Sequence, residues 1–256
     1  MEKIGRYQVF VEPFHCDFSH RLFMGNLGNH MLNVADFHSR ERGFGMDFLN
    51  SINKTWVLSR LAIEMDDMPH QYEHFRIDTW AESAMRYFTS RNFRVVGTSS
   101  DEEKVYGYGR SIWALIDTET RQPTNLFDIN GGSIRNWVDA DEKNPMAKLT
   151  RVQMSNDAKL VRTIDTYYSD VDINGHINSV KYIEHVLDLF PVSWYKEHPL
   201  RRFDIAYVAE THQGDKLNFY QEQDENDELA FKIRITKTTA EGGEEVEVCR
   251  SKVKFV

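Results

Sequence analysis

A short polar run in the C-terminal part of the chain carries the side chains best suited to chemistry. Asp172, Asn174 and His176 alternate with small or apolar residues, and we call these three residues the polar run. If the backbone there is extended, every second side chain points to the same side. A carboxylate, an amide and an imidazole together can act as acid, base and hydrogen-bond partner. The run therefore predicts a candidate catalytic site.

The alternative for these residues is structural. Asp, Asn and Gly favour Asx-type turns and helix caps, so the run could simply connect a loop to a helix. That helix is predicted by apolar residues at helical spacing and by a proline that ends it: Ile177, Val180, Ile183, Val186, Leu187 and Pro191. On residue types alone, the two interpretations are equally supported.

The chain also repeats itself. Three pairs of segments match in the same order: 29–34 with 175–180 (offset 146), 60–75 with 202–217 (offset 142) and 110–111 with 250–251 (offset 140). A nearly constant offset predicts a tandem duplication of one folding unit. In the first half the polar run corresponds to Asn26, Gly28 and His30, so the histidine is the group that both halves share. A purely structural role gives little reason for this difference, which favours the functional interpretation.

Each half is predicted to contain a strand, a loop, one apolar helix and then four more strands rich in β-branched and aromatic residues. The expected strands are 7–11, 55–65, 75–82, 87–96 and 105–116, then 163–169, 203–208, 216–223, 230–238 and 245–256, with turns at 99–103 and 241–244. This order indicates an α+β fold in which each half is a curved antiparallel sheet wrapped around one long helix.

The boundary between the halves is expected in a polar segment with prolines and paired glycines, from about residue 118 to 157. We place an N-terminal domain at 1–135, a linker at 136–157 and a C-terminal domain at 158–256. The first domain is expected to bind an acyl chain and the second to carry the chemistry, for the reason given next.

The sequence resembles the acyl-acyl carrier protein (acyl-ACP) thioesterases of plants and bacteria, which consist of two hot-dog folds in tandem. The run from Asp172 to Tyr182 is similar to the family pattern Asp-x-Asn-x-His-x-Asn-Asn-x-Lys-Tyr, and 29–30, 43–45, 56–60 and 78–80 resemble first-half landmarks. The resemblance covers nearly the whole chain. It implies a tandem hot-dog fold and hydrolysis of fatty acyl-ACP to a free fatty acid and the carrier thiol, without a cofactor.

The resemblance also implies a catalytic set: Asp172, Asn174, His176 and, on the strand after the helix, Glu210. Plant members commonly have a cysteine where this chain has Thr211, and a hydroxyl without a dedicated base is a poor nucleophile. We therefore expect direct attack by water. Either Glu210 or His176 takes the proton, Asp172 orients its neighbours and Asn174 donates a hydrogen bond, while backbone N–H groups near His176 are expected to help bind the oxyanion.

Candidates to line the acyl site are Met31, Val34 and Trp56, although such residues more often belong to an ordinary core. The acyl carrier protein is expected to be acidic, whereas this chain has a net charge of −9. Docking would then require a local basic patch. Its candidates are the cationic residues near the site: Lys181, Arg201 and Arg202.

Composition excludes several other classes. The negative charge argues against nucleic-acid binding, and no apolar stretch approaches the roughly 18 residues that a membrane span requires. The N-terminus has no secretory pattern and Cys16 and Cys249 make no disulfide framework, so a cytoplasmic location is expected. His70 and His74 follow Pro69 in a loop-like segment, so no metal site is expected there. A homodimer is compatible with the sequence.

Three other functions stay open. The first two are acyl-CoA thioesterase and enoyl-thioester hydratase, both of them enzymes of the same fold. The third is a non-catalytic acyl-binding module, which the polar run argues against because a lipid carrier would favour apolar residues there.

Overall fold

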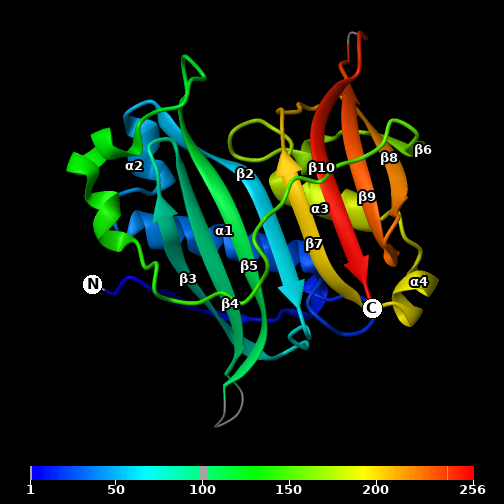
Figure 1. Cartoon of the computed structure of the whole chain (residues 1–256), viewed down its shortest axis with the longest axis horizontal. Helices are drawn as coiled ribbons and strands as arrows, with labels where there is room; N and C mark the ends of the chain where they lie inside the picture. Colours follow the sequence, from blue (N-terminus) through cyan, green and yellow to red (C-terminus); the bar gives the residue numbers. More distant parts are fainter. Residues whose placement is uncertain (1, 99–102, 241) are drawn as a thin grey trace. The chain divides into compact units, whose positions relative to one another are not determined.

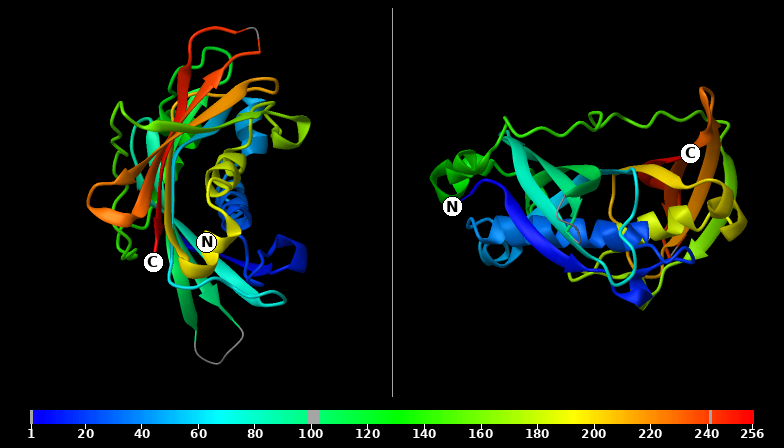
Figure 2. Two further views of the ribbon diagram at one scale, coloured as in Figure 1. Left: turned by 90° about the vertical axis from the view of Figure 1, so that its right-hand side faces the viewer. Right: turned by 90° about the horizontal axis from the view of Figure 1, so that it is seen from below.

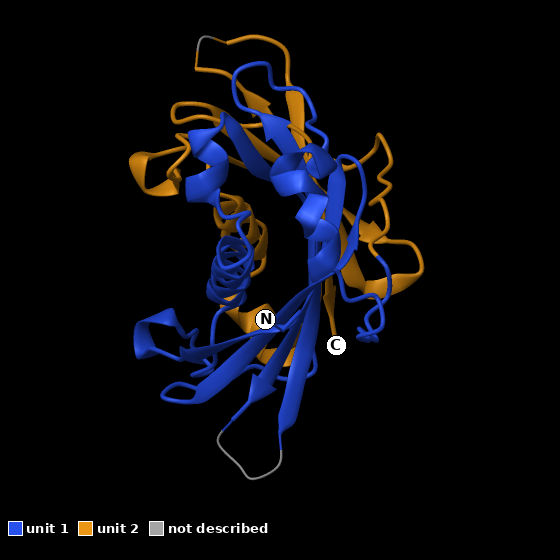
Figure 3. Cartoon of the chain, turned by 90° about the vertical axis from the view of Figure 1, so that its left-hand side faces the viewer, with its two compact units in different colours: residues 1–148 blue, residues 149–256 orange. Residues whose placement is uncertain are grey.

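The computed structural model describes residues 2–98, 103–240 and 242–256, and the chain forms two compact units, Met1–Lys148 and Leu149–Val256 (Figures 1 and 3). We call them unit 1 and unit 2. The turns expected at 99–103 and 241–244 fall partly outside the described residues. Among the described residues, no helix combines the length and the apolar composition that crossing a membrane requires.

Unit 1 is an antiparallel sheet with one long helix. Its elements are β1 (Gly5–Phe10), η1 (Pro13–His15), α1 (Met24–Arg40), α2 (Met46–Ser51), β2 (Lys54–Met65), β3 (His74–Ala84), β4 (Phe88–Gly97), β5 (Lys104–Asp117) and η2 (Leu126–Trp137). The strands lie in the order β1-β3-β4-β5-β2. Helix α1 contacts β1 and β3 and runs along one face of this sheet (Figure 2).

Unit 2 repeats this arrangement. Its elements are β6 (Lys159–Asp165), η3 (Tyr168–Asp170), α3 (Ser179–Leu187), α4 (Val192–Glu197), β7 (Leu200–Tyr207), β8 (Lys216–Asp224), β9 (Asp227–Thr238) and β10 (Val246–Phe255). Its strands lie in the order β6-β8-β9-β10-β7, which is the order of unit 1 strand for strand. The predicted duplication and the α+β architecture of each half are therefore confirmed.

The expected strand at 163–169 is wrong in its second half. The observed strand ends at Asp165, and the chain then enters the η3 turn. The reason is local, because the Asp170 carboxylate accepts a hydrogen bond from the Tyr167 backbone N–H at 2.8 Å. A carboxylate that satisfies the backbone in this way favours a turn over a strand.

The two units differ in where their main helices begin. Helix α3 begins at Ser179, and the offset of 146 carries this position to Asn33, but α1 already begins at Met24. The residues that correspond to the polar run therefore lie inside the helix in unit 1. The helix presents an apolar face, with Leu27, Met31 and Val34 buried.

The segment expected to be a linker is ordered against unit 1 in its first part. The Asn144 side chain donates hydrogen bonds to Oδ1 of Asn92 (3.1 Å) and to the Gly109 carbonyl (3.0 Å). The Arg110 guanidinium donates to the carbonyl of Met146, whose side chain is buried. Residues 144–146 thus satisfy polar groups of β4 and β5.

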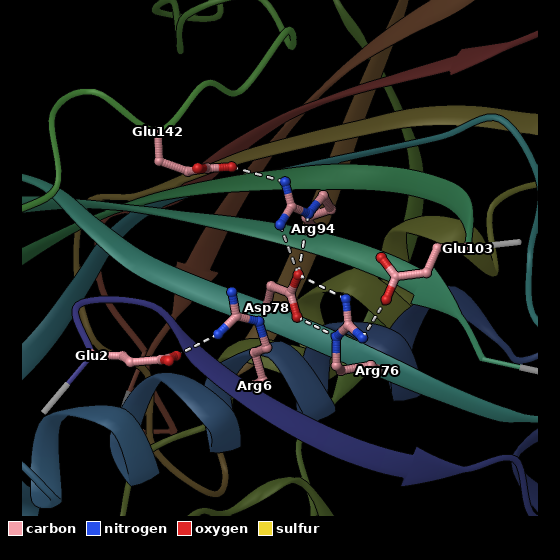
Figure 4. A network of polar contacts seen from close by, with 7 residues as sticks. All are labelled: Glu2, Arg6, Arg76, Asp78, Arg94, Glu103 and Glu142. Carbon is pink, nitrogen blue, oxygen red and sulfur yellow. Dashed lines mark hydrogen bonds and ion pairs between the residues drawn. The ribbon is translucent and has the colours of Figure 1, made fainter.

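A buried carboxylate joins strands of unit 1. Asp78 on β3 is fully buried and accepts hydrogen bonds from Arg76 (Nε, 2.6 Å) and Arg94 (Nη2, 2.9 Å), as Figure 4 shows. Arg94 also bonds to Glu142 and Arg76 to Glu103, and hydrogen bonds to Glu103 and Asp78 raise the pKa of Arg76. A buried charge is stable only when it is paired in this way. The network fixes β3 and β4 to the segment around residue 142.

Candidate active site

The polar run forms a tight turn, and its backbone is not extended as the sequence suggested. Oδ1 of Asp172 accepts hydrogen bonds from the backbone N–H groups of Asn174 (2.8 Å) and His176 (3.2 Å). Gly175 has a φ of +81°, a conformation that glycine adopts without steric cost. The expectation of parallel side chains on an extended segment is therefore wrong, because Asp172 and Gly175 together reverse the chain.

The turn leads directly into α3. Asn178 caps this helix, because its side-chain oxygen accepts a hydrogen bond from the Val180 backbone N–H at 3.0 Å. The backbone N–H of Asn178 donates to the Asp170 carbonyl at 2.7 Å. The helix ends at Leu187, ahead of Pro191, as its apolar spacing predicted. The Asx turn and the helix cap are therefore both present.

The same turn presents His176 to Glu210. Nε2 of His176 lies 3.3 Å from Oε2 of Glu210, and the two side chains are 26% and 37% exposed. The family resemblance predicts that Glu210 lies on the strand after the helix. This prediction is wrong, because β7 ends at Tyr207. It belongs to the connection to β8, and we call residues 208–215 the Glu210 loop. The imidazole and carboxylate form a solvent-accessible acid–base pair.

Hydrogen bonds hold the Glu210 loop at the carbonyls of Glu210 and Thr211. The Ile177 backbone N–H donates to the carbonyl of Thr211 at 2.8 Å, which joins the loop to the end of the turn. Nζ of Lys237 on β9 donates to the Glu210 carbonyl at 2.7 Å and lies 3.4 Å from Oδ2 of Asp215. The sequence reasoning missed Lys237, because a single lysine in a strand carries no signal of such a role.

The backbone donors around His176 are already used. The N–H groups of residues 174 and 176 donate to the Asp172 carboxylate, that of 175 to the Asp172 carbonyl, and those of 177 and 178 to the carbonyls of Thr211 and Asp170. These five N–H groups therefore have partners within the chain, and the expected contribution of backbone groups near His176 to an oxyanion hole stays a prediction. Asn174 lies at the exposed tip of the turn, so its side-chain amide is the donor there that can reach a substrate.

Half-buried side chains contact the turn and the first part of α3. The Tyr207 hydroxyl donates to the Ser179 carbonyl in the first turn of α3 at 2.8 Å, and burial raises the pKa of Tyr207 well above its ordinary value. Burial also lowers the pKa of His185, whose Nε2 lies 3.7 Å from Asp170. Thr211 is 1% exposed, so its hydroxyl is not presented to substrate.

The corresponding residues of unit 1 make no such turn. Asn26 and His30 both lie in α1, and the Asn26 side chain donates to the carbonyl of His15 at 3.1 Å. His30 is half-buried near Glu12 and His15, and burial lowers its pKa. Of the two shared histidines, His176 faces a carboxylate across a turn, whereas His30 faces the segment that precedes its own helix.

The acyl-site candidates occupy three different environments. Met31 is fully buried in the core. Val34 lines a pocket of about 400 Å³ between β1 and α1, together with residues that include Tyr7 and Phe37. Trp56 donates its indole N–H to the Phe44 carbonyl at 2.9 Å and packs against a separate apolar cluster.

Two candidates for the carrier patch are paired with acidic groups. Lys181 bonds to Glu184 at 2.7 Å, and the Arg202 guanidinium makes two hydrogen bonds to Asp204, at 2.7 and 2.8 Å. Arg201 is the neighbouring residue on β7. These pairs reduce the local positive field that the residue types alone suggest.

Comparison with known proteins places these features in context. The chain matches the acyl-ACP thioesterase N-terminal domain over residues 5–129 and the acyl-ACP thioesterase C-terminal domain over residues 153–255. An acyl-ACP thioesterase from Bacteroides thetaiotaomicron is 50% identical, covers 99% of this chain and 98% of its own, and superposes with a TM-score of 0.88. The 12:0-ACP thioesterase from Umbellularia californica is 17% identical and shares the fold, with a TM-score of 0.81 over 100% of this chain and 98% of its own.

Curated plant relatives are more distant. The chloroplastic palmitoyl-acyl carrier protein thioesterase of Gossypium hirsutum is 24% identical over 72% of this chain and 46% of its own length. The chloroplastic oleoyl-acyl carrier protein thioesterase of Coriandrum sativum is 22% identical over 90% of this chain and 65% of its own length. The chain thus spans about half to two thirds of these relatives. The tandem hot-dog fold is confirmed, and the chain belongs to the acyl-ACP thioesterase family.

Proposed function

We propose that this protein hydrolyses the thioester of fatty acyl-ACP and releases the fatty acid and the carrier thiol, as a step of fatty acid biosynthesis. The observation that carries the proposal is the His176–Glu210 pair, with a nitrogen-to-oxygen distance of 3.3 Å and both side chains accessible to solvent. Such a pair can accept a proton from water and return it to a leaving group. Membership of the acyl-ACP thioesterase family supports the substrate class.

In the proposed reaction, water adds to the thioester carbonyl carbon while His176 or Glu210 takes its proton. The oxyanion that forms accepts a hydrogen bond from the Asn174 amide, the donor left after the backbone N–H groups of the turn are used. Collapse of the tetrahedral intermediate breaks the C–S bond, and the leaving thiolate receives the proton. Asp172 acts as a positioning residue, because its carboxylate holds the turn. Burial of Thr211 supports attack by water.

The N-terminal domain (1–135) and the C-terminal domain (158–256) would have different roles in the reaction. The C-terminal domain carries the polar run and Glu210, and the N-terminal domain binds the acyl chain through the face of α1 that includes Val34, while the fully buried Met31 would act through the packing of that helix. The pocket beside Val34 supports this assignment, since apolar side chains of β1 and α1 line part of it. Trp56 would act indirectly, because its hydrogen bond to the Phe44 carbonyl fixes the apolar cluster that contains Phe44.

The acidic carrier would dock near Lys181, Arg201 and Arg202. Because Lys181 and Arg202 are paired with acids within the chain, the attraction is expected to be weak and strongly reduced by salt. Raising the ionic strength should then lower turnover of acyl-ACP more than turnover of a small thioester. Equal salt dependence of the two substrates would exclude this docking surface.

The cytoplasmic location and the homodimer remain predictions, and sedimentation would test the second.

The first experiment is a thiol-release assay with acyl-ACP, acyl-CoA and an enoyl thioester. The proposal predicts release of the carrier thiol and of free fatty acid from acyl-ACP, with weaker release from acyl-CoA. Loss of the enoyl double bond without thiol release would identify a hydratase instead. Tight acyl-ACP binding without any product would identify a binding module and would overturn the proposed hydrolysis.

A further inference from the structure

Glu12, His15 and His30 of unit 1 form a cluster to which the proposed hydrolysis assigns no chemical role. Nδ1 of His15 lies 3.0 Å from Oε2 of Glu12. One potential ligand atom from each of the three residues lies within 4.8 Å of the other two. We propose that this cluster binds a divalent metal ion of the zinc class.

The donor set fits this class of ion. Two imidazoles and one carboxylate bind Zn²⁺ in sites that keep one coordination position open. Donors on bonds of about 2.0–2.2 Å are separated by roughly 3.4 Å in a tetrahedral site. Glu12 is exposed, so its side chain can move toward the ion without disturbing the core.

The backbone already holds the donors in place. Glu12 directly precedes η1 and His15 is its last residue, and residues three apart in a 3₁₀ turn lie on the same side. The carbonyl of His15 accepts hydrogen bonds from the Phe23 backbone N–H (2.9 Å) and from the Asn26 side chain (3.1 Å). These bonds fix η1 to the start of α1, the helix that carries His30. Little conformational entropy would be lost on binding.

A pocket adjoins the cluster. Glu12 and His30 line the pocket of about 400 Å³ between β1 and α1, together with Asn33 and Val34. The open coordination position could thus hold a water molecule, while the apolar part of the same pocket, beside Val34, is the part proposed above to bind the acyl chain. The internal repeat points the same way. His176 has Glu210 as its partner, but Met68 occupies the matching position in unit 1, where the carboxylate that lies within 4.8 Å of His30 is that of Glu12, from another element.

Calorimetric titration of the untagged full chain with Zn²⁺ tests the proposal. The expected result is one saturable site per chain, with affinity reduced at least about tenfold in His30→Gln and in His15→Gln. His70→Gln removes an exposed histidine of the same unit and should leave the affinity unchanged. Zn²⁺ should also raise the melting temperature of the wild type and of His70→Gln, but not of His30→Gln.

Two further measurements make the test decisive. Circular dichroism of each variant shows whether it is folded, and the partly exposed His15 provides a second variant if the more buried His30 does not tolerate substitution. Replacement of Zn²⁺ by Co²⁺ should give the visible absorption of a tetrahedral site in the wild type and in His70→Gln, but not in His30→Gln or His15→Gln. Absence of saturable binding, or equal binding by the wild type and a folded His15→Gln variant, would overturn the proposal.

Discussion

Nε2 of His176 lies 3.3 Å from Oε2 of Glu210, although the two residues belong to different connections of unit 2. His176 ends the turn before α3, and Glu210 follows β7. The Ile177–Thr211 backbone hydrogen bond joins these connections one residue further along each. The pair is therefore set by backbone structure and does not depend on flexible side chains alone.

Removal of either member of this pair should abolish most activity. His176→Ala and Glu210→Gln are each expected to lower kcat by about 10²–10⁴-fold, because proton transfer from water is lost. Steady-state thiol release measures the effect, and thermal melting should show that both variants are folded. Glu225→Gln, an exposed residue of unit 2, is the control and should behave as wild type. Near-wild-type turnover in either site variant would contradict the assignment.

Asn174→Ala should affect the rate with little effect on stability. Its side chain lies at the exposed tip of the turn, and its proposed contribution is one hydrogen bond to the oxyanion. Loss of one such donor lowers kcat by about 10²–10³-fold. Asn174→Asp keeps the size but removes the donor, so it should be at least as slow. If Asn174→Asp retains full activity, the amide is not an oxyanion donor.

Asp172 should affect activity as a positioning residue, because its carboxylate holds the turn that presents His176. Asp172→Asn keeps the oxygen that accepts from residues 174 and 176, whereas Asp172→Ala leaves both N–H groups without that partner. We expect Asp172→Ala to lower the free energy of unfolding by about 1–3 kcal/mol and to lose most activity. Asp172→Asn should retain more of both. Urea denaturation and kcat measure the two effects, and identical behaviour of the variants would refute a positioning role.

Lys237 should position the Glu210 loop. Its ammonium group donates to the Glu210 carbonyl and pairs with Asp215, and its side chain is only 15% exposed. Lys237→Met is expected to lower kcat more than it changes KM and to shift the pH profile of kcat, because the carboxylate moves relative to His176. Lys237→Arg should restore part of the rate. A loss of stability with an unchanged pH profile would indicate a structural role alone.

His38 in unit 1 should make stability depend on pH. Burial, together with Arg91 and Arg42, lowers the pKa of this histidine to about 3 in the folded chain. In the unfolded chain His38 binds a proton near its ordinary pKa of 6.5. The contribution of neutral His38 to the free energy of unfolding is therefore complete above pH 6.5 and is lost as the pH falls toward 3. The slope should approach 1.4 kcal/mol per pH unit.

Urea denaturation between neutral and acidic pH measures this slope. His38→Gln can keep the hydrogen bond to the Lys3 carbonyl and the one from Arg91, but it does not titrate. The variant should therefore flatten the dependence of unfolding free energy on pH. An unchanged slope in a folded His38→Gln variant would show that other groups cause it.

The sequence by itself determined the repeated architecture of this chain. Strands such as β2 and β9 fall close to their expected limits, because side-chain alternation and β-branched residues are local properties of a strand. The helix after the polar run was predicted equally well, since its apolar face and Pro191 lie within a few turns of each other. The family pattern from Asp172 to Tyr182 is also local.

Tertiary structure decided what these segments do together. The turn at the polar run is itself local, because the Asp172 carboxylate accepts from residues 174 and 176 and Gly175 reverses the chain, and the residue types had already offered it as the alternative to an extended segment. The approach of Glu210 to His176 depends on Lys237 and on the Ile177–Thr211 hydrogen bond, both of which join residues distant in sequence. Such contacts form only when separate strands and helices pack, so residue spacing along the chain does not encode them.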